Sequence, residues 1–446
     1  MEIIINAYKT ALNVLGRAKI TEGGYRLIKY CVVLKVEEGV LLFHTLTREL
    51  LLLTPEEYEN HLESSYLRER WFVVPEDTKE KEYADLVRWV CKNAKKKPQH
   101  ITKYTILTTT DCNARCFYCY EKGYQKYPMS EETADKTAAF IKENCGGEKV
   151  HISWFGGEPL YNSKVIDRIC RQMHNAGVKY QSSMVSNGYL FDDEMIEKAL
   201  NIWNLKSVQI TLDGTEEIYN RSKAFIYRDG SAYKKVLSNI ERLLDAKISV
   251  VIRMNMDLKN AEDLLKLTEE LAKRFQENRK PIVYAHLIFD DEKSWTEIYS
   301  KEELTKLYRV LTRLEEKFET YGFSKESKKG LRRYLKLNHC MADSGGAVVI
   351  TPDGHLGLCE HFAESELIGH INFPERDQGM IENWKQWRDE QAECAACFYY
   401  PECVRLKKCT GYGDCTDLER EKIRKRTQRS MKNELYYWKI RQSRSE

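Results

Sequence analysis

The strongest constraint on the fold is an alternation of short apolar segments with longer amphipathic ones between residues 104 and 290. Short β-rich runs that each lead into a helical pattern indicate successive βα units around a parallel sheet. Six units in about 190 residues are too few for the eight-stranded barrel of roughly 250 residues, so we predict an α/β fold, an open, partial (β/α)6 TIM barrel. The expected strands are Tyr104–Thr109, Lys149–Phe155, Lys179–Val185, Ser207–Leu212, Ile248–Met254 and Ile282–Phe289.

Other regions flank this barrel in the 446-residue chain, which is too long for a single core. Residues 22–92 form extended apolar runs followed by helical patterns, the first beginning at Thr54-Pro55-Glu56-Glu57 with Thr as N-cap and Pro in the first turn. Residues 340–415 are rich in cysteines and turns and too poor in apolar residues to fold without cross-links or metal. The expected units are a small α+β domain (1–97), the barrel (98–325), a cysteine-rich domain (326–417) and a basic helix (418–446).

The basic helix has ten Lys/Arg against four Glu over residues 418–446. One interpretation is a solvated terminal helix, and the other is a contact to an acidic peptide. In the first case, the residues expected to pack it onto the protein are Ile423, Leu435, Tyr436, Trp438 and Ile440.

Composition excludes several classes of partner. A net charge of +3 with 31% charged residues provides no field of the size that binds nucleic acid. No apolar run approaches the roughly 20 residues that span a bilayer, and no signal-peptide pattern opens the chain, so a cytoplasmic location without membrane contact is expected. Fourteen cysteines in such a chain indicate metal where they cluster. The isolated ones, expected to be small buried side chains, are Cys31, Cys91, Cys145 and Cys170.

The first cluster is Cys112, Cys116 and Cys119, directly after the first barrel strand. The C-terminal ends of barrel strands are where barrel chemistry takes place. Three thiolates on a short loop can hold three corners of a [4Fe–4S] cube, which leaves one iron open to chelate a small molecule. A zinc knuckle with a fourth ligand from elsewhere is the alternative interpretation.

With Tyr118, this C-x3-C-x-aromatic-C pattern resembles the hallmark of the radical S-adenosylmethionine (SAM) family. Later segments are similar to further motifs of that family: Gly156-Gly157-Glu158-Pro159, Ser186-Asn187-Gly188, Leu212-Asp213-Gly214, and Arg253 with Asn255. The resemblance implies a cluster on the three cysteines, Tyr118 against the adenine, glycines that approach the methionine part of SAM, and Glu158 or nearby carbonyls that accept from its amino group. Where relatives often place Arg after His-Asp, this chain has Arg221 and Lys223 as candidates for the SAM carboxylate. The implied SAM contacts are Tyr118, Gly156, Gly157, Glu158, Ser186, Asn187, Arg221, Lys223 and Arg253.

The later cysteines resemble the SPASM extension of radical SAM enzymes, which carries two auxiliary [4Fe–4S] clusters and would bring the total to three. The resemblance assigns Cys340, Cys359 and Cys409 to the first auxiliary cluster. It assigns Cys394, Cys397, Cys403 and Cys415 to the second. Two cubes need eight thiolates and seven are present, so an iron of the first is expected to be open, for example to a substrate cysteine. A zinc ribbon is the alternative, with His339, His355, His361 and His370 nearby.

Enzymes of this kind often modify ribosomally made (RiPP) peptides and begin with a winged-helix-like domain that captures the leader of the precursor peptide. The resemblance therefore implies an oxidoreductase, a peptide maturase that installs a thioether or carbon–carbon cross-link. Its expected partners are a precursor peptide with a leader segment and an external flavodoxin or ferredoxin as electron donor. The alternatives are a formylglycine-forming enzyme similar to anaerobic sulfatase maturases and a zinc-stabilised peptide-binding protein; residues 22–92 could equally be a structural cap over the barrel.

Overall fold

The computed structural model describes residues 1–16, 23–94, 98–276, 279–288, 293–324, 329–362, 365–409 and 415–443. Within these residues the main sheet has the order β12-β11-β10-β9-β8-β7-β13-β14-β15. All six predicted strands are present and mutually parallel, which confirms the α/β class with a mostly parallel sheet. They are β7 (Lys103–Leu107), β8 (Val150–Phe155), β9 (Tyr180–Ser186), β10 (Leu205–Thr211), β11 (Ser249–Met256) and β12 (Ile282–Leu287). Phe289, the last residue predicted in the sixth strand, lies outside the described residues.

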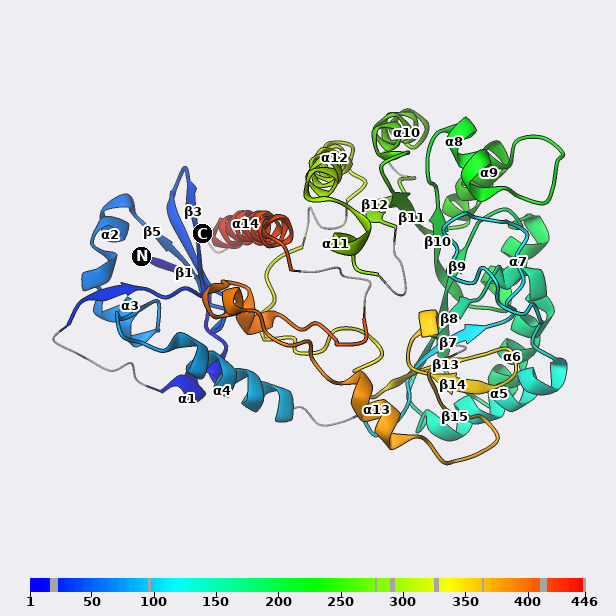
Figure 1. The fold of residues 1–446 in the computed structure, drawn as a ribbon, viewed down its shortest axis with the longest axis horizontal. Helices are drawn as coiled ribbons and strands as arrows, with labels where there is room; N and C mark the ends of the chain where they lie inside the picture. The colour runs from blue at the N-terminus through cyan, green and yellow to red at the C-terminus, as the bar shows by residue number, and fades with distance from the viewer. Residues whose placement is uncertain are drawn as a thin grey trace.

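Helices cover the outer face of this sheet (Figure 1). Burial alternates along β8 and β9, because one face packs on the helices and the other is only half-buried. The half-buried face and the C-terminal strand ends are therefore available for a site. The helices of this part are α5 (Glu131–Asn144), α6 (Ser163–Asn175), α7 (Asp193–Asn201), α8 (Glu216–Lys223), α9 (Ala232–Asp245), α10 (Ala261–Arg274), α11 (Trp295–Ile298) and α12 (Lys301–Thr320).

The cysteine-rich region is not separate from the barrel sheet. Its strand β13 (Ala347–Ile350) pairs in parallel with β7, and β14 (His355–Gly357) and β15 (Leu367–His370) continue the sheet in antiparallel order. The run Ala-Val-Val-Ile of β13 is fully buried, which explains why it joins the barrel core. This stretch, which also contains α13 (Gln378–Trp384), thus shares its sheet with the barrel. The expected boundaries at residues 97 and 325 lie outside the described residues.

The N-terminal unit is α+β, as predicted. Its antiparallel sheet has the order β1-β5-β4-β3, and β2 pairs with β6. The helix predicted after Thr54 is present with the full capping box of Thr54 and Glu57. The elements are β1 (Glu2–Ile5), α1 (Lys9–Leu15), β2 (Tyr25–Leu27), β3 (Cys31–Val36), β4 (Gly39–His44), β5 (Leu50–Leu53), α2 (Pro55–Glu59), α3 (Ser65–Glu69), β6 (Val73–Pro75) and α4 (Glu80–Asn93).

This unit packs on the cysteine-rich region and the C-terminal helix, at the opposite end of the molecule from β7–β10 (Figure 1). Among the described residues, its cores include Leu335 and Tyr400 on one side and Phe398, Met431 and Leu435 on the other. The contacts of this unit are therefore with residues 335–400 and α14. The four isolated cysteines are buried, as expected.

The C-terminal helix α14 (Asp417–Gln442) contacts both the N-terminal sheet and the helix α12. Its Leu435 is buried against the N-terminal sheet, and its Glu419 accepts a hydrogen bond from Tyr308 of α12 at 2.8 Å. Tyr436, which the sequence placed in the packing face, is 61% exposed, so that expectation is wrong. No helix among the described residues is long and apolar enough to cross a bilayer.

His44 provides a pH test of the N-terminal unit. Its ring is buried, with Nε2 at 3.1 Å from the Trp71 carbonyl and Nδ1 accepting from Leu46 N at 3.3 Å, and burial lowers its pKa to about 3. Because the unfolded value is near 6.5, the stabilisation is complete above that pH and is lost as the pH falls toward 3. Lowering the pH from 7 to 5 should reduce the free energy of unfolding by about 2 kcal/mol.

Hydrogen–deuterium exchange over residues 40–53, corrected for intrinsic rates, measures this loss. The His44→Gln chain should show little of the pH response. An equal response in the two chains would contradict the assignment to His44.

Candidate functional site

The cysteine loop lies at the C-terminal end of β7 and is held by main-chain hydrogen bonds from three directions. Arg115 N donates to the Lys223 carbonyl at 2.9 Å, Ile226 N donates to the Asn113 carbonyl at 2.9 Å, and Glu158 N donates to the Asp111 carbonyl at 2.9 Å. The loop is therefore fixed by the segments that follow β8 and α8. Its three cysteines, Cys112, Cys116 and Cys119, are half-buried.

The three thiols lie within electrostatic reach of one another. Burial, and then the charge of Glu158, raises the pKa of Cys112 to about 12, with further contributions from Cys116 and Cys119. Burial raises the pKa of Cys119 to about 11. The thiols of Cys112 and Cys119 become thiolates near neutral pH only where a cation compensates for the burial, so the donor set fits a metal cluster. Among the described residues, no three His, Cys, Asp or Glu side chains converge on the position of one ion.

Gly156 and Gly157 allow two loops to meet. A Cβ at Gly156 would lie 2.2 Å from the Thr109 carbonyl oxygen, and one at Gly157 would lie 2.3 Å from that of Asp111. Gly156 also has φ +122°, which favours glycine. The sequence-based expectation was an approach of these glycines to methionine. In the structure, the close approach is to the backbone that leads into the cysteine loop.

Glu158 joins this loop to the turn after β9. Its Oε1 accepts from Ser186 Oγ at 2.8 Å and from Leu160 N at 3.2 Å, and its Oε2 accepts from Asn187 N at 2.8 Å. The side chain is fully buried, and burial raises its pKa to about 7 against these donors. Glu158 thus fixes the turn after β9 to the loop that follows β8.

Asn187 connects the turn to the cysteines. Its Nδ2 donates to Asn113 Oδ1 at 2.6 Å and lies 3.8 Å from Cys112 Sγ. Asn113 was not singled out from the sequence, because nothing in its local pattern distinguishes it from other loop residues. The structure therefore brings Ser186, Asn187 and Cys112 to one place, as the motif order indicated.

Lys223 takes part in a buried network of hydrogen bonds and an ion pair. Its Nζ lies 3.0 Å from Asp213 Oδ2 and donates to Tyr118 Oη at 2.6 Å and to Thr211 Oγ1. Tyr118 Oη in turn donates to Asp213. An ammonium group has three N–H donors, and all three are used here. The expected contact of Lys223 with the SAM carboxylate does not fit this geometry, and Arg221 lies on the exposed side of α8.

Asp213 and Arg253 extend this network across the sheet. Asp213 accepts from Asn255 N at 3.1 Å, and Arg253 Nε donates to Asn255 Oδ1 at 2.8 Å. Burial, with the nearby Arg253 charge, lowers the pKa of His286 to about 4. Arg253 is half-buried on β11, where it also interacts with Tyr284 of β12.

The later cysteines fall into two groups by their mutual effect on thiol pKa. Burial raises the pKa of Cys340 to about 11, and Cys409 adds to that rise. Burial raises the pKa of Cys359 as well, and Cys340 and Cys409 are among its further causes. The second group consists of Cys397, Cys403 and Cys415. Cys415 adds to the raised pKa of both Cys397 and Cys403. Cys394 adjoins this group, because Cys397 N donates to the Cys394 carbonyl at 3.1 Å.

The four histidines of this region have other contacts. His339 Nδ1 is 2.8 Å from the Val404 carbonyl oxygen, and His355 and His370 pack edge to face. The His361 ring lies 4.3 Å from that of Tyr120, so the segment after Cys359 touches the one after Cys119. The group of Cys340, Cys359 and Cys409 thus lies next to the cysteine loop.

Comparison with known proteins identifies part of the chain. Residues 106–271 match the model of the radical SAM superfamily. The chain is 32% identical over 176 residues to the GTP 3′,8-cyclase of Clostridium perfringens (strain 13 / Type A), a match that covers 37% of this chain and 52% of that protein. It is 26% identical over 170 residues to the sporulation killing factor maturation protein SkfB of Bacillus subtilis (strain 168), covering 38% and 39%. The chain thus spans about half the length, or less, of these curated relatives.

Solved structures share the fold. Native anSMEcpe with bound AdoMet and Kp18Cys peptide superposes with a TM-score of 0.58 at 15% identity, over 76% of this chain and 99% of that one. SuiB of Streptococcus suis bound to precursor peptide SuiA superposes with a TM-score of 0.51 at 11% identity, over 85% and 94%. Residues 106–271 therefore carry a radical SAM domain.

Proposed function

We propose that this chain is a peptide-modifying radical SAM enzyme that holds a [4Fe–4S] cluster on Cys112, Cys116 and Cys119. The observation that carries the proposal is the position of these thiols, on one loop after β7 beside the Ser186–Asn187 turn. When bound, the cluster and SAM would supply reductive cleavage of SAM to methionine and a 5′-deoxyadenosyl radical that abstracts hydrogen. An external flavodoxin or ferredoxin is the proposed electron donor.

The residues around the loop orient SAM. Asn187 lies beside Cys112, where a ligand of the open iron would bind. The hydroxyl of Tyr118 is fixed by Asp213 and Lys223, and the ring of Tyr118 would contact the adenine of bound SAM. Arg253 is the cation proposed for the SAM carboxylate, since its planar fork suits a carboxylate and Lys223 has no donor to spare. The half-buried sheet face keeps substrate near the site and limits water.

The substrate class is supported by the fold and by the later cysteines. Both superposed proteins, anSMEcpe and SuiB, are bound to a peptide in those structures, and the maturation protein SkfB is a sequence relative. We assign Cys340, Cys359 and Cys409 to a first auxiliary [4Fe–4S] cluster with one open iron. Cys394, Cys397, Cys403 and Cys415 are assigned to a second. The proposed product is a thioether or carbon–carbon cross-link, with one auxiliary cluster taking the surplus electron.

The N-terminal unit is proposed to bind the leader of the precursor peptide. Strand β3 is an edge of its sheet, and an extended peptide can pair with such an edge. Gln428 of α14 reaches the Val33 carbonyl of β3 at 3.5 Å, so the helix borders that edge. Formylglycine formation is the second candidate, because anSMEcpe with its cysteine-containing peptide gives the higher TM-score of the two.

Mass spectrometry of a peptide product tests the proposal. The anaerobically reconstituted protein is incubated with SAM, dithionite and short peptides encoded beside its gene. We expect a SAM-dependent loss of two hydrogen atoms for each cross-link. A thiol-to-aldehyde change would indicate formylglycine, and an unchanged mass with deuterium uptake would indicate epimerisation. Cleavage of SAM with every peptide unchanged would contradict a peptide substrate.

A further inference from the structure

A buried arginine of the N-terminal unit reaches the cysteine-rich region. Arg88 of α4 is 6% exposed, and its Nη1 donates to the carbonyl oxygen of Cys403 at 3.0 Å and to that of Tyr400. Its guanidinium carbon also lies 4.7 Å from the ring centroid of Trp387 and 4.5 Å from that of Tyr400. Arg88 therefore fixes the segment that carries Cys403, one of the four cysteines assigned to the second auxiliary cluster.

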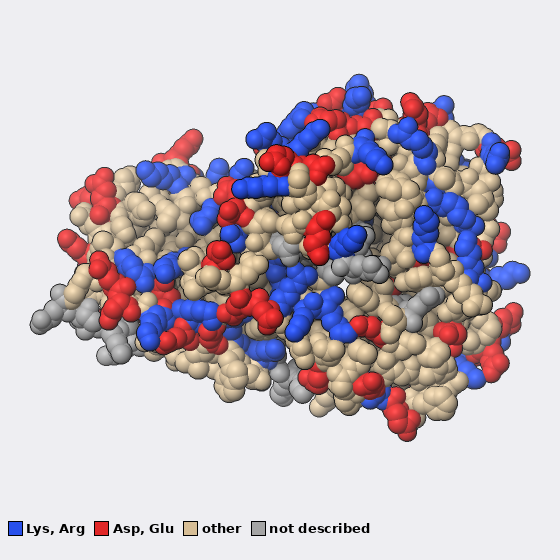
Figure 2. Space-filling model, viewed as in Figure 1, with Lys and Arg blue, Asp and Glu red and all other residues tan. Residues whose placement is uncertain are grey.

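Arginines from three parts of the chain lie around this second group of cysteines. Burial raises the pKa of Cys403, and the charges of Arg405 and Arg88 act against that rise. Nη1 of Arg420, on α14, lies 3.4 Å from Cys415 Sγ. Lys and Arg also gather at the centre of the molecule, between its two halves, in Figure 2. Arg88 is buried, whereas Arg405 and Arg420 are half-buried, so water screens the charge of Arg88 least.

The first group of later cysteines has the opposite surroundings. Burial raises the pKa of Cys340, and Asp343 and Glu360 add to that rise. Burial also raises the pKa of Cys359, and Glu360 adds to it. The two groups thus differ in the sign of the charges next to them, and an effect of Arg88 is expected at the second group alone.

The carboxylates near Arg88 are paired with another cation. Tyr400, the ring beside Arg88, donates from its hydroxyl to Asp85 and lies 2.6 Å from Glu390. Both carboxylates form ion pairs with Lys81, at 2.7 and 2.8 Å. In the part of the chain that the structure describes, no carboxylate forms an ion pair with Arg88. A buried cation without a counter-charge is costly, so Arg88 suits a position beside an anion that the polypeptide does not supply.

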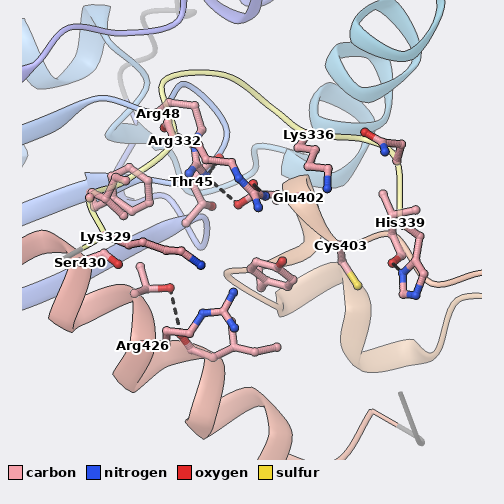
Figure 3. Close-up of a pocket in the computed structure, with 18 of the residues that line it drawn as sticks. Thr45, Arg48, Lys329, Arg332, Lys336, His339, Glu402, Cys403, Arg426 and Ser430 are labelled. Carbon is pink, nitrogen blue, oxygen red and sulfur yellow. Dashed lines mark hydrogen bonds and ion pairs between the residues drawn. The ribbon is translucent and has the colours of Figure 1, made fainter. Parts of the chain in front are cut away.

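The carboxylate next to Cys403 in the chain is engaged elsewhere as well. Glu402 lines a pocket of about 620 Å³ between the N-terminal sheet and α14, where it pairs with Arg48 at 3.0 Å and with Arg332 at 3.1 Å (Figure 3). Two arginines share this one carboxylate, so Glu402 adds no net negative charge to the surroundings of Cys403.

We propose that Arg88 is the buried counter-charge of the second auxiliary [4Fe–4S] cluster and raises its reduction potential. The proposal rests on the proposed function, which assigns that cluster to Cys394, Cys397, Cys403 and Cys415. A cube on four thiolates is an anion that gains one more negative charge when it takes up an electron, so a fixed cation beside it favours the reduced form. Because α4 belongs to the N-terminal unit, that unit supplies part of the charge around the cluster.

A redox titration followed by electron paramagnetic resonance tests the role of this charge. The sample is the cluster-loaded full chain, in which each cube takes up one electron from dithionite through soluble mediators. Arg88→Gln keeps an amide donor and loses the charge. One step should become at least about tenfold less favourable in this variant, a fall of about 59 mV for one electron. The other two steps, including the one that responds to added SAM, should not move.

Two matched variants separate charge from packing. Arg88→Lys keeps the charge and should leave all three steps at their wild-type potentials. Lys92→Gln removes an exposed cation one turn further along α4, which lies 4.0 Å from the ring centroid of Trp387. It should also leave the three steps unchanged, because water and salt screen an exposed charge. The iron content of each sample is measured beside its titration.

Any of four outcomes would overturn the role of Arg88. They are unchanged steps in Arg88→Gln, a fall in more than one step, an equal fall in Arg88→Lys or Lys92→Gln, and a loss of about four irons from both Arg88 variants. Loss of that iron from Arg88→Gln alone would support the role, because Arg88→Lys retains the charge. A wild-type chain without a third redox step would overturn the cluster assignment itself, and the proposal with it.

Discussion

The Cys116→Ala chain is expected to release no 5′-deoxyadenosine above the level of an enzyme-free control when SAM and dithionite are supplied without oxygen. The loop after β7 provides three thiols, and a fourth corner of the cube must stay open for SAM. Two thiols are too few to hold the cluster, so no iron is available to bind SAM for its reductive cleavage. Chromatography of the nucleoside measures the effect directly.

Iron content provides a second measurement on the same samples. The Cys116→Ala chain should lose on the order of four irons relative to the wild-type chain, with the auxiliary clusters retained. Cys170→Ala is the matched control, because Cys170 is fully buried in the barrel core and belongs to none of the three groups. It should keep both iron and nucleoside release.

The outcome that would contradict the assignment is equally definite. A colourless, zinc-loaded wild-type chain would mean that Cys112, Cys116 and Cys119 close around one ion, as in the zinc knuckle considered from the sequence. Nucleoside release retained by Cys116→Ala would mean that another side chain replaces the thiol.

The parallel strands were predictable because each carries its own local signal. A buried strand such as β8 is a short apolar run, and the helix after it repeats at helical spacing, so neither needs knowledge of distant residues. Strand β13 was missed for the opposite reason. Its four residues look like any short apolar run, and only pairing with β7, more than 240 residues earlier in the chain, makes them part of the barrel.

The site was predictable by position and less so by role. The motif order placed Cys112, Ser186 and Asn187 together correctly, because the ends of parallel strands meet at one edge of the sheet. The roles of Glu158 and Lys223 depend on which donors and acceptors surround them in space. Glu158 is enclosed by Leu160, Ser186 and Asn187, and Lys223 by Asp213, Tyr118 and Thr211, and no local pattern reveals those partners.

The Lys223→Met chain is expected to lose about 3–5 kcal/mol of unfolding free energy, because Asp213 is left as an unpaired charge in the interior. The two side chains are 3% and 1% exposed, and their charged atoms are 3.0 Å apart. Burial disfavours the ammonium, yet the nearby Asp213 carboxylate outweighs it and the pKa of Lys223 lies well above its ordinary value. Urea unfolding of the full chain, followed by tryptophan fluorescence, measures the loss.

Two further chains separate the buried pair from a general effect of removing a lysine. Lys234→Met removes a lysine that is 74% exposed and 3.5 Å from Glu216, and it should cost less than about 1 kcal/mol. Adding Asp213→Asn to Lys223→Met should recover part of the loss, since the amide oxygen can still accept from Asn255 N and no charge remains buried. Two results would show that Lys223 does not neutralise Asp213. One is a Lys223→Met chain as stable as the Lys234→Met chain, and the other is a Lys223→Met, Asp213→Asn chain less stable than Lys223→Met alone. In that case Lys223 would again be free to meet the SAM carboxylate, and Tyr118 would need another explanation for its fixed position.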